Sequence, residues 1–368
     1  MTRPVILVCG PSPGAVGGGP THVRNLFASP LASEFELVLL ETGSRGAESP
    51  ARDEPFLAAL WRLATGPFAL AAAIARHRPA VVHLNTAMTP RGFWREWLNL
   101  LVCRAFGRRV AYQVHGGDLA SVTRPPGMLA IVRATLSWPD AIVLLASAER
   151  VEYEQLLRAR RLVVIPNAVD TRVFRGEAER VHRGTVQRVG FLARLLPAKG
   201  VFECIEAVRL LRREPAFADL ELRIAGSGPA REEIERRVAA EGLVDAVQLL
   251  GPLPAARTPA FLRDCDVTLL PTVREGLPYA ILESLAAGTP VVTTRTGGIP
   301  DVMRDGEHGR FVEPRNAEQI AAALRELAAS PERLREMSRA CASWAERELG
   351  LERLARQFGQ LYRELGAK

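Results

Sequence analysis

Two carboxylates, Glu275 and Glu283, are separated by seven residues in the stretch Glu-Gly-Leu-Pro-Tyr-Ala-Ile-Leu-Glu-Ser-Leu-Ala-Ala-Gly-Thr-Pro, which is residues 275–290. Pro278 suits the first position of a helix, because its missing N–H would be unpaired there in any case. Gly288, with a proline two residues later, ends that helix. We therefore expect Glu275 in the loop before the helix and Glu283 inside it, roughly a turn and a half from its start.

The backbone N–H groups of Gly276 and Leu277 lie between these carboxylates in the sequence and are expected to form a partial positive pole that favours an anion. A diphosphate flanked by hydroxyl-rich groups suits this arrangement. The N–H groups would bind the phosphate, and the carboxylates would accept hydrogen bonds from sugar hydroxyls. An ordinary amphipathic helix with one solvated glutamate near each end explains the same spacing, so both interpretations stay open.

Two cations, Arg194 and Lys199, follow the predicted strand 188–192, and a helix is expected directly after Gly200. Ligands of open α/β sheets bind at the carboxyl ends of strands, so these cations are well placed to hold a diphosphate. The guanidinium can engage two oxygens at once, and the ammonium acts as a point charge. The alternative is a pair of solvated surface cations. A glycosidase also uses paired carboxylates, ~5–10 Å apart, but the two cations would then lack a purpose.

A histidine, His115, ends a predicted strand in Tyr-Gln-Val-His-Gly-Gly-Asp, residues 112–118. At a strand's carboxyl end and beside two glycines, it is expected to face a cleft. There it could donate a hydrogen bond to a sugar or take part in transferring an acceptor proton. A structural histidine packed under a loop is the alternative. His83 and Asn85, at another strand end, are weaker candidates.

A glycine-rich loop, residues 14–21, follows the first predicted strand and includes Gly18. Its spacing does not give Gly-x-Gly-x-x-Gly, so it resembles a dinucleotide-binding loop only superficially. Glu41 is at about the right distance for a ribose-binding acid without being decisive. Glycine permits close approach of the backbone to a ligand, and a merely flexible loop is the alternative.

The letters Asp264-Cys265-Asp266 match an Asp-x-Asp metal motif. They directly precede the predicted strand 267–270, where an aspartate most simply ends a helix or caps a turn. No other group of residues has the spacing of metal ligands. The sequence therefore predicts no metal site.

Short apolar runs alternate with helical patterns along the whole chain, which predicts βαβ units and parallel sheets. The expected strands are 5–8, 36–40, 81–84, 110–114, 141–145, 188–192, 220–224, 247–250, 267–270 and 291–294. A polar stretch without apolar periodicity, 167–184, separates two such series. We therefore expect two doubly wound domains, followed by a helical C-terminus from Pro331 onward with a bend at Leu349-Gly350.

The composition is that of a soluble globular chain: 368 residues, 48% hydrophobic and 24% charged, with a net charge of +7. The mild excess of base fits an anionic substrate or surface. A nucleic-acid partner is not predicted, because aromatic residues make up 6% and no dense basic run is interleaved with them. Five scattered cysteines suggest no disulfide framework and favour a reducing cytosol. No stretch reaches the ~18 apolar residues of a membrane span.

The segment 91–109 contains five arginines, one glutamate and two tryptophans. Basic amphipathic helices with tryptophan can lie in a membrane interface. A core helix with a solvated basic rim is the alternative. This segment is the one indication in the sequence of a lipid-linked acceptor.

The string from Arg274 through Gly-Gly-Ile-Pro-Asp, residues 297–301, to Pro314 closely resembles the C-terminal signature of nucleotide-sugar glycosyltransferases of family four, which have the GT-B fold. The resemblance extends to 190–200 and to 223–229. It covers the second half of the chain almost continuously and is loose in the first half.

The resemblance implies a retaining glycosyltransferase that moves a sugar from a nucleotide diphosphate sugar to an acceptor hydroxyl, without metal or cofactor. It implies two Rossmann-like α/β domains with parallel sheets facing a central cleft. The acceptor-binding domain would be 1–178 and the nucleotide-sugar-binding domain 179–349, with the last helix, 350–368, packed back on the first. The acceptor could be lipid-linked, a polysaccharide or another glycoconjugate. The place of action would be the cytoplasm, with peripheral contact to an anionic inner membrane face through 91–109.

The family's roles carry over to particular positions. Arg194 and Lys199 would hold the diphosphate, Glu275 the hydroxyls of the donor sugar, and Glu283 the ribose. His115 completes the predicted catalytic set of His115, Glu275, Arg194 and Lys199. The remaining predicted donor contacts are Gly18, Gly276, Leu277 and Pro278. Two other classes stay open: a GT-B epimerase or phosphorylase acting on sugar phosphates, and a non-catalytic nucleotide-sugar-binding protein.

Overall fold

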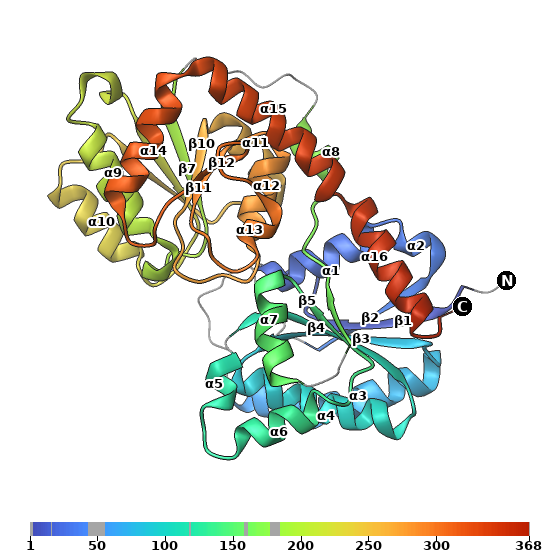
Figure 1. Cartoon of the computed structure of the whole chain (residues 1–368). Coiled ribbons are helices and arrows are strands. Elements are labelled where there is room, and N and C mark those ends of the chain that lie inside the picture. Colours follow the sequence, from blue (N-terminus) through green and yellow to red (C-terminus); the bar gives the residue numbers. More distant parts are fainter. Residues whose placement is uncertain are drawn as a thin grey trace. The chain divides into compact units, whose positions relative to one another are not determined.

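The computed structural model describes residues 3–15, 17–42, 56–117, 119–157, 161–176 and 185–367, with only the backbone for 56–62. The chain divides into two units (Figure 1). The first unit is residues 1–168 together with 351–368, and the second is residues 169–350. Along the chain the first unit ends at residue 168, and the last helix is counted with it. The boundary expected at 178 lies outside the described residues.

The first unit is built on a sheet of six parallel strands in the order β2-β1-β3-β4-β5-β6. The strands are β1 (Val5–Gly10), β2 (Glu36–Glu41), β3 (Val81–Met88), β4 (Arg109–Gly117), β5 (Ala141–Leu144) and β6 (Leu162–Val164). All but β6 match predicted strands. Its helices are α1 (Gly18–Ala28), α2 (Leu31–Glu34), α3 (Phe56–His77), α4 (Pro90–Ala105), α5 (Leu119–Thr123), α6 (Met128–Thr135), α7 (Ser147–Leu156) and α16 (Leu351–Glu364).

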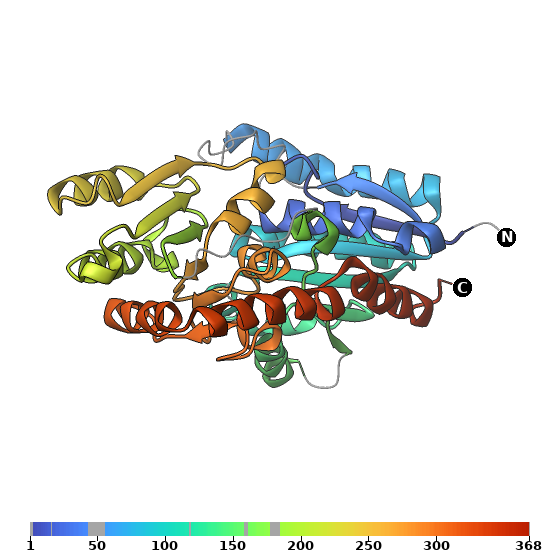
Figure 2. The ribbon, with the colours of Figure 1, turned by 90° about the horizontal axis from the view of Figure 1, so that it is seen from above.

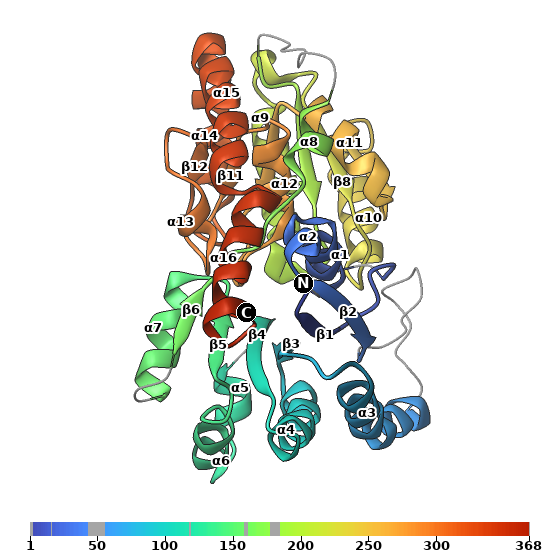
Figure 3. The ribbon, with the colours of Figure 1, turned by 90° about the vertical axis from the view of Figure 1, so that its right-hand side faces the viewer.

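Helices cover both faces of this sheet, because successive strand side chains point to opposite sides. Leu7 and Cys9 face a core that includes side chains of α3 to α7. Ile6 and Val8 face the other core, made with α1, α2 and α16 (Figure 3). Helix α16 runs beside the strands (Figure 2) and buries Phe358 completely between the sheet and α1.

The second unit repeats the architecture with the strand order β12-β11-β10-β7-β8-β9, again all parallel. Its strands are β7 (Arg188–Leu192), β8 (Glu221–Ala225), β9 (Val247–Gly251), β10 (Val267–Leu270), β11 (Val291–Thr293) and β12 (Gly309–Phe311). Its helices are α8 (Thr171–Arg175), α9 (Val201–Leu211), α10 (Arg231–Ala240), α11 (Thr258–Asp264), α12 (Tyr279–Ala286), α13 (Ile299–Val302), α14 (Ala317–Ala329) and α15 (Pro331–Glu348). Two helix-flanked parallel sheets confirm the predicted fold class.

The predicted bend between the last two helices is also confirmed. Helix α15 ends at Glu348, Leu349 caps it, and α16 begins at Leu351. Leu349 leaves helical geometry with ψ 0, and its carbonyl accepts a hydrogen bond from the N–H of Val169 at 2.9 Å. This bond ties the turn between the helices to the start of the second unit.

Candidate active site

Helix α12 begins one residue later than the sequence predicted. Pro278 is the residue before the helix, with an extended backbone (φ −73, ψ 131), and Tyr279 is the first helical residue. The prediction that Pro278 occupies the first helical position was therefore wrong by one. The N–H groups at the helix start belong to Tyr279 and Ala280, and those of Gly276 and Leu277 lie in the loop before it.

This loop is held by a pair of glycines to which no role had been given, Gly297 and Gly298. The N–H of Gly298 donates to the carbonyl of Gly276 at 2.6 Å. Gly297 has φ 57, and a Cβ there would overlap the carbonyl oxygens of Glu275 and Gly276. Only glycine permits this approach, so the Gly-Gly pair fixes the backbone that carries Glu275.

A second loop, after β7, is pinned to the segment after β10. The hydroxyl of Thr272 donates to the carbonyl of Ala198 at 3.1 Å, and the N–H of Val273 donates to the same carbonyl at 2.8 Å. Gly200 has φ 78, and a Cβ there would overlap the carbonyl of Pro271. β7 and β10 are neighbours in the sheet. Segments far apart in the sequence therefore meet at its carboxyl edge.

At that meeting point Lys199 and Glu275 form an ion pair between Nζ and Oε1. Each side chain is 18% exposed, so water screens the pair only in part. The structure thus brings together two of the predicted site residues. It also shows that the ammonium already has an anionic partner before any phosphate is bound.

Arg194 lies on the same loop as Lys199 and is exposed. Within the described part of the chain, its guanidinium makes no hydrogen bond or ion pair. The backbone on either side is fixed against the glycine-rich stretch after β8, because the N–H of Leu195 donates to the carbonyl of Ser227 at 2.9 Å. A Cβ at Gly226 or Gly228 would overlap the carbonyls of Ala193 or Leu195. Glu283 is half-buried on α12.

In the first unit, His115 is half-buried at the end of β4, and its Nε2 lies 2.8 Å from Oδ1 of Asn85 on the neighbouring strand. The Asn85 amide nitrogen donates to the carbonyl of Cys9 at 3.1 Å, which orients the amide oxygen towards the histidine. His115 Nε2 is therefore the donor in this bond, and Nδ1 carries the lone pair. Burial, together with a smaller effect of His83, lowers the pKa of His115 to about 3, so the ring is neutral near pH 7.

Two more histidines lie beside His115. His22, from α1, packs its ring 4.5 Å from the His115 ring, centroid to centroid, and is completely buried. His83 is also completely buried, with Nδ1 2.7 Å from the Tyr362 hydroxyl and Nε2 2.9 Å from Gln113 Oε1. Burial lowers the pKa of His83 to about 4. Its two hydrogen bonds make His83 a structural residue beneath the site.

The glycine-rich loop places Gly18 as the exposed first residue of α1, after Gly17 with φ 136. The loop follows β1, and His115 lies near the end of β4; these two strands flank β3 in the sheet. Gly18, Asn85 and His115 therefore share the carboxyl edge of the first sheet, as the parallel topology predicts. His22 was missed by the sequence reasoning, although its place one turn after the glycines was a usable signal.

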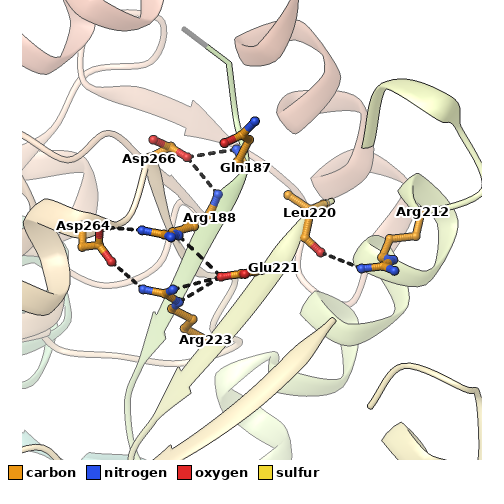
Figure 4. A network of polar contacts seen from close by, with 8 residues as sticks. All are labelled: Gln187, Arg188, Arg212, Leu220, Glu221, Arg223, Asp264 and Asp266. Atoms are coloured by element: carbon orange, nitrogen blue, oxygen red, sulfur yellow. Dashed lines mark hydrogen bonds and ion pairs between the residues drawn. The ribbon is translucent and has the colours of Figure 1, made fainter. Parts of the chain in front are cut away.

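The letters Asp264-Cys265-Asp266 lie at the opposite, amino edge of the second sheet, where their carboxylates have structural partners. Asp266 accepts hydrogen bonds from the N–H groups of Gln187 and Arg188 at 2.9 and 2.8 Å. Asp264 pairs with Arg188 at 2.8 Å and with Arg223 at 2.5 Å (Figure 4). Asp266, just before β10, is thus tied to the start of β7, and Asp264, at the end of α11, is tied to β7 and β8.

Comparison with known proteins gives the family. Residues 177–344 match the model of glycosyl transferases group 1, and residues 16–173 match that of glycosyltransferase family 4. The GDP-mannose-dependent alpha-(1-6)-phosphatidylinositol monomannoside mannosyltransferase of Mycolicibacterium smegmatis is 30% identical over 263 residues, which are 67% of this chain and 68% of that protein.

Two solved structures share the fold. A sucrose-phosphate synthase from Thermosynechococcus elongatus superposes with a TM-score of 0.80 at 20% identity, covering 99% of this chain and 100% of that one. Anabaena HepE in complex with UDP-glucose gives 0.76 at 16% identity, covering 98% and 99%. The fold is thus that of the GT-B glycosyltransferases. The chain belongs to the group 1, family 4 glycosyltransferases and transfers a sugar from a nucleotide-sugar donor.

Proposed function

We propose that this glycosyltransferase is retaining and metal-independent, and that its donor is a nucleoside diphosphate sugar held by the second unit. The observation that carries the proposal is the Lys199–Glu275 ion pair, with Arg194 on the same loop and its guanidinium without a partner among the described residues. Two cations at the carboxyl edge of a parallel sheet provide the charge that a diphosphate needs, without a metal ion.

Donor binding would exchange partners within this ion pair. The diphosphate takes the place of the Glu275 carboxylate at Lys199, and Arg194 engages further phosphate oxygens. Glu275 is then released to accept hydrogen bonds from the sugar hydroxyls, while Glu283 on α12 holds the ribose. The predicted roles of the two glutamates are therefore compatible with an ion pair that exists before the donor binds.

Catalysis would be mainly electrostatic. As the glycosidic bond breaks, negative charge develops on the departing diphosphate, and Arg194 and Lys199 stabilise it. The acceptor oxygen bonds to the anomeric carbon on the face that the diphosphate leaves, and a phosphate oxygen takes the acceptor proton, so the anomeric configuration is retained. His115 would act as a hydrogen-bond acceptor through Nδ1, since its Nε2–H is committed to Asn85.

The proteins similar to this chain differ in the nucleotide sugar that they are named for or contain. The Mycolicibacterium relative is named for GDP-mannose and a phosphatidylinositol mannoside, and the HepE complex contains UDP-glucose. Among the described residues no helix is long and apolar enough to cross a membrane. We therefore propose peripheral contact at a cytoplasmic membrane face through 91–109, with a lipid-linked acceptor.

The test is calorimetry with UDP, GDP, UDP-glucose and GDP-mannose, with and without chelator, followed by proton NMR of the product. We expect one nucleotide to bind with unchanged affinity in chelator, and the product to keep the anomeric configuration of the donor. Inverted product refutes the retaining mechanism. Activity that disappears in chelator and returns with a divalent cation refutes metal independence.

A further inference from the structure

An open cavity of about 300 Å³ lies at the turn between α4 and β4, at the amino edge of the first unit's sheet. Three arginines, Arg104, Arg108 and Arg109, line it together with Trp138 and Asp140. Arg109 begins β4 and His115 lies near its end, so roughly 20 Å of extended strand separates Arg109 from His115. No residue of the predicted catalytic set lines it, and its three arginines belong to the segment 91–109 that was proposed above for membrane contact.

The charges around the cavity do not cancel. Asp140 is the one acid in its lining, and both of its oxygens are used: one pairs with Arg109 at 2.6 Å, and the other accepts from the N–H of Val110 at 2.8 Å. In the part of the chain that the structure describes, neither Arg104 nor Arg108 has an acidic partner. Three cations and one carboxylate leave two positive charges at the cavity.

The two unpaired arginines are positioned by the protein. The Arg104 guanidinium lies over the Trp138 ring, 5.6 Å from its centroid. Arg108 donates through NH1 to the carbonyl of Pro79 at 3.3 Å, while its Nε is buried and has no hydrogen-bond acceptor among the described residues. A buried donor without an acceptor is unfavourable, so an anion that reaches Nε of Arg108 would relieve that cost.

We propose that this cavity is a second binding site, and that its ligand is a phosphate group. Two guanidinium groups present fork-shaped donors that match phosphate oxygens in pairs, and a phosphate's charge matches the excess of two. The volume is at the lower end of the range for ligand pockets and leaves room for a substituent on the phosphate. The indole of Trp138 forms the apolar wall against which that substituent packs.

The phosphate could come from a soluble ester or from a lipid headgroup. Leu101 and Phe106, on the last turn of α4 and just after it, are 37% and 42% exposed, and Arg104 lies between them in the sequence. Apolar side chains beside a phosphate site suit a lipid, whose acyl chains would take them up. The experiment therefore has one arm for each source.

The test uses the full chain with ¹⁵N-labelled tryptophan, and the indole signal of Trp138 is assigned from the W138F variant. Sodium phosphate replaces sodium chloride at constant ionic strength. We expect the Trp138 signal to shift saturably, and Arg108→Gln and Arg104→Gln each to weaken binding about tenfold or more, as the loss of a charged hydrogen bond implies. Arg124→Gln removes an exposed arginine that does not line the cavity, and it should leave the titration unchanged. Arg194→Gln, in the proposed active site, should also leave it unchanged.

The second arm measures flotation with phosphatidylglycerol vesicles. Flotation that Arg104→Gln and Arg108→Gln abolish, and that Arg124→Gln preserves, assigns the phosphate to a lipid. A shift of the Trp138 signal by phosphate without flotation assigns it to a soluble ester. The proposal is overturned if neither arm shows binding, or if both cavity variants bind as the wild type does. Arg104 is exposed, so its variant remains informative even if Arg108→Gln fails to fold.

Discussion

Removing the charge of Glu275 is expected to change nucleotide affinity in the opposite direction to the loss of an ordinary binding contact. If the donor diphosphate replaces Glu275 at Lys199, then Glu275 competes with free nucleoside diphosphate. Glu275→Gln should therefore leave the affinity for free nucleoside diphosphate unchanged or raise it. Turnover of the intact nucleotide sugar should fall in the same variant, because the carboxylate that orients the sugar is lost.

The expected size of the change in nucleotide affinity follows from how exposed the Lys199–Glu275 pair is. Both side chains are 18% exposed, so the pair lies between a solvated surface pair and a buried one. Surface pairs contribute ~0.2–1 kcal/mol, and a release of about 1 kcal/mol corresponds to roughly fivefold tighter binding of the nucleotide. Losing a charged hydrogen bond to the sugar costs ~1.5–3 kcal/mol of transition-state stabilisation, which is about a 10- to 150-fold fall in kcat/KM.

The assay is calorimetry with the nucleoside diphosphate, combined with steady-state kinetics on the nucleotide sugar. Glu283→Gln is the matched control, since it makes the same change of charge on α12. It should weaken both ligands, because both contain the ribose. If Glu275→Gln weakens the free nucleotide while Glu283→Gln does not, the two roles are reversed. If Lys199→Ala leaves nucleotide binding unchanged, the exchange of partners is wrong.

Three further outcomes are expected. Arg194→Ala should weaken nucleoside diphosphate binding by ~1.5–3 kcal/mol with no change in Tm, because its side chain is exposed; wild-type affinity by calorimetry would make it a surface cation. Gly297→Ala should abolish turnover, because it displaces the loop that carries Glu275. Gly242 has a similar φ of 67 but open space around it, so Gly242→Ala should lower only stability. Enzyme kinetics and urea denaturation measure the two effects separately. His83 is neutral in the fold and its pKa is lowered from 6.5 to about 4, so its stabilising effect is complete above pH 6.5 and is lost as the pH falls towards 4. That loss is about 3 kcal/mol of the free energy of unfolding. In urea denaturation, the free energy of unfolding should depend less on pH in His83→Gln than in the wild type. An unchanged dependence on pH would contradict a neutral, buried His83.

The fold was largely predictable from the sequence, and the two missed strands show why some of it was not. β6 and β12 are the last strands at the edges of their sheets, and each has three residues. An edge strand has one neighbour and is buried less, so it needs no apolar run. β12 is Gly-Arg-Phe and has none. β6 begins the apolar run Leu-Val-Val-Ile, residues 162–165, which is as long as the predicted strand 5–8, so the sequence did carry a signal for β6 that the prediction left out.

The candidate site was predictable in its location but not in its contacts. Parallel strands place their carboxyl ends at one edge, so Arg194, Lys199 and Glu275 were expected near one another. Their pairing depends on β7 lying next to β10, and the sequence does not give the order of strands. The same holds for His115 and Asn85, which meet because β3 and β4 are adjacent. Contacts between loops depend on the strand order, whereas the strands themselves depend on local patterns.

Glycine accounts for much of the precision at the carboxyl edge of the second sheet. Gly200, Gly226 and Gly297 all adopt positive φ, and at each a Cβ would overlap the backbone carbonyl of another loop. Four loops, those after β7, β8, β10 and β11, are thus in direct backbone contact, and the charged side chains start from fixed positions. Such contacts leave little in the sequence except a glycine, which is equally common in flexible loops. The structure distinguishes the two cases, because a glycine with open space around it, such as Gly242, can be replaced at modest cost, and one against a carbonyl cannot.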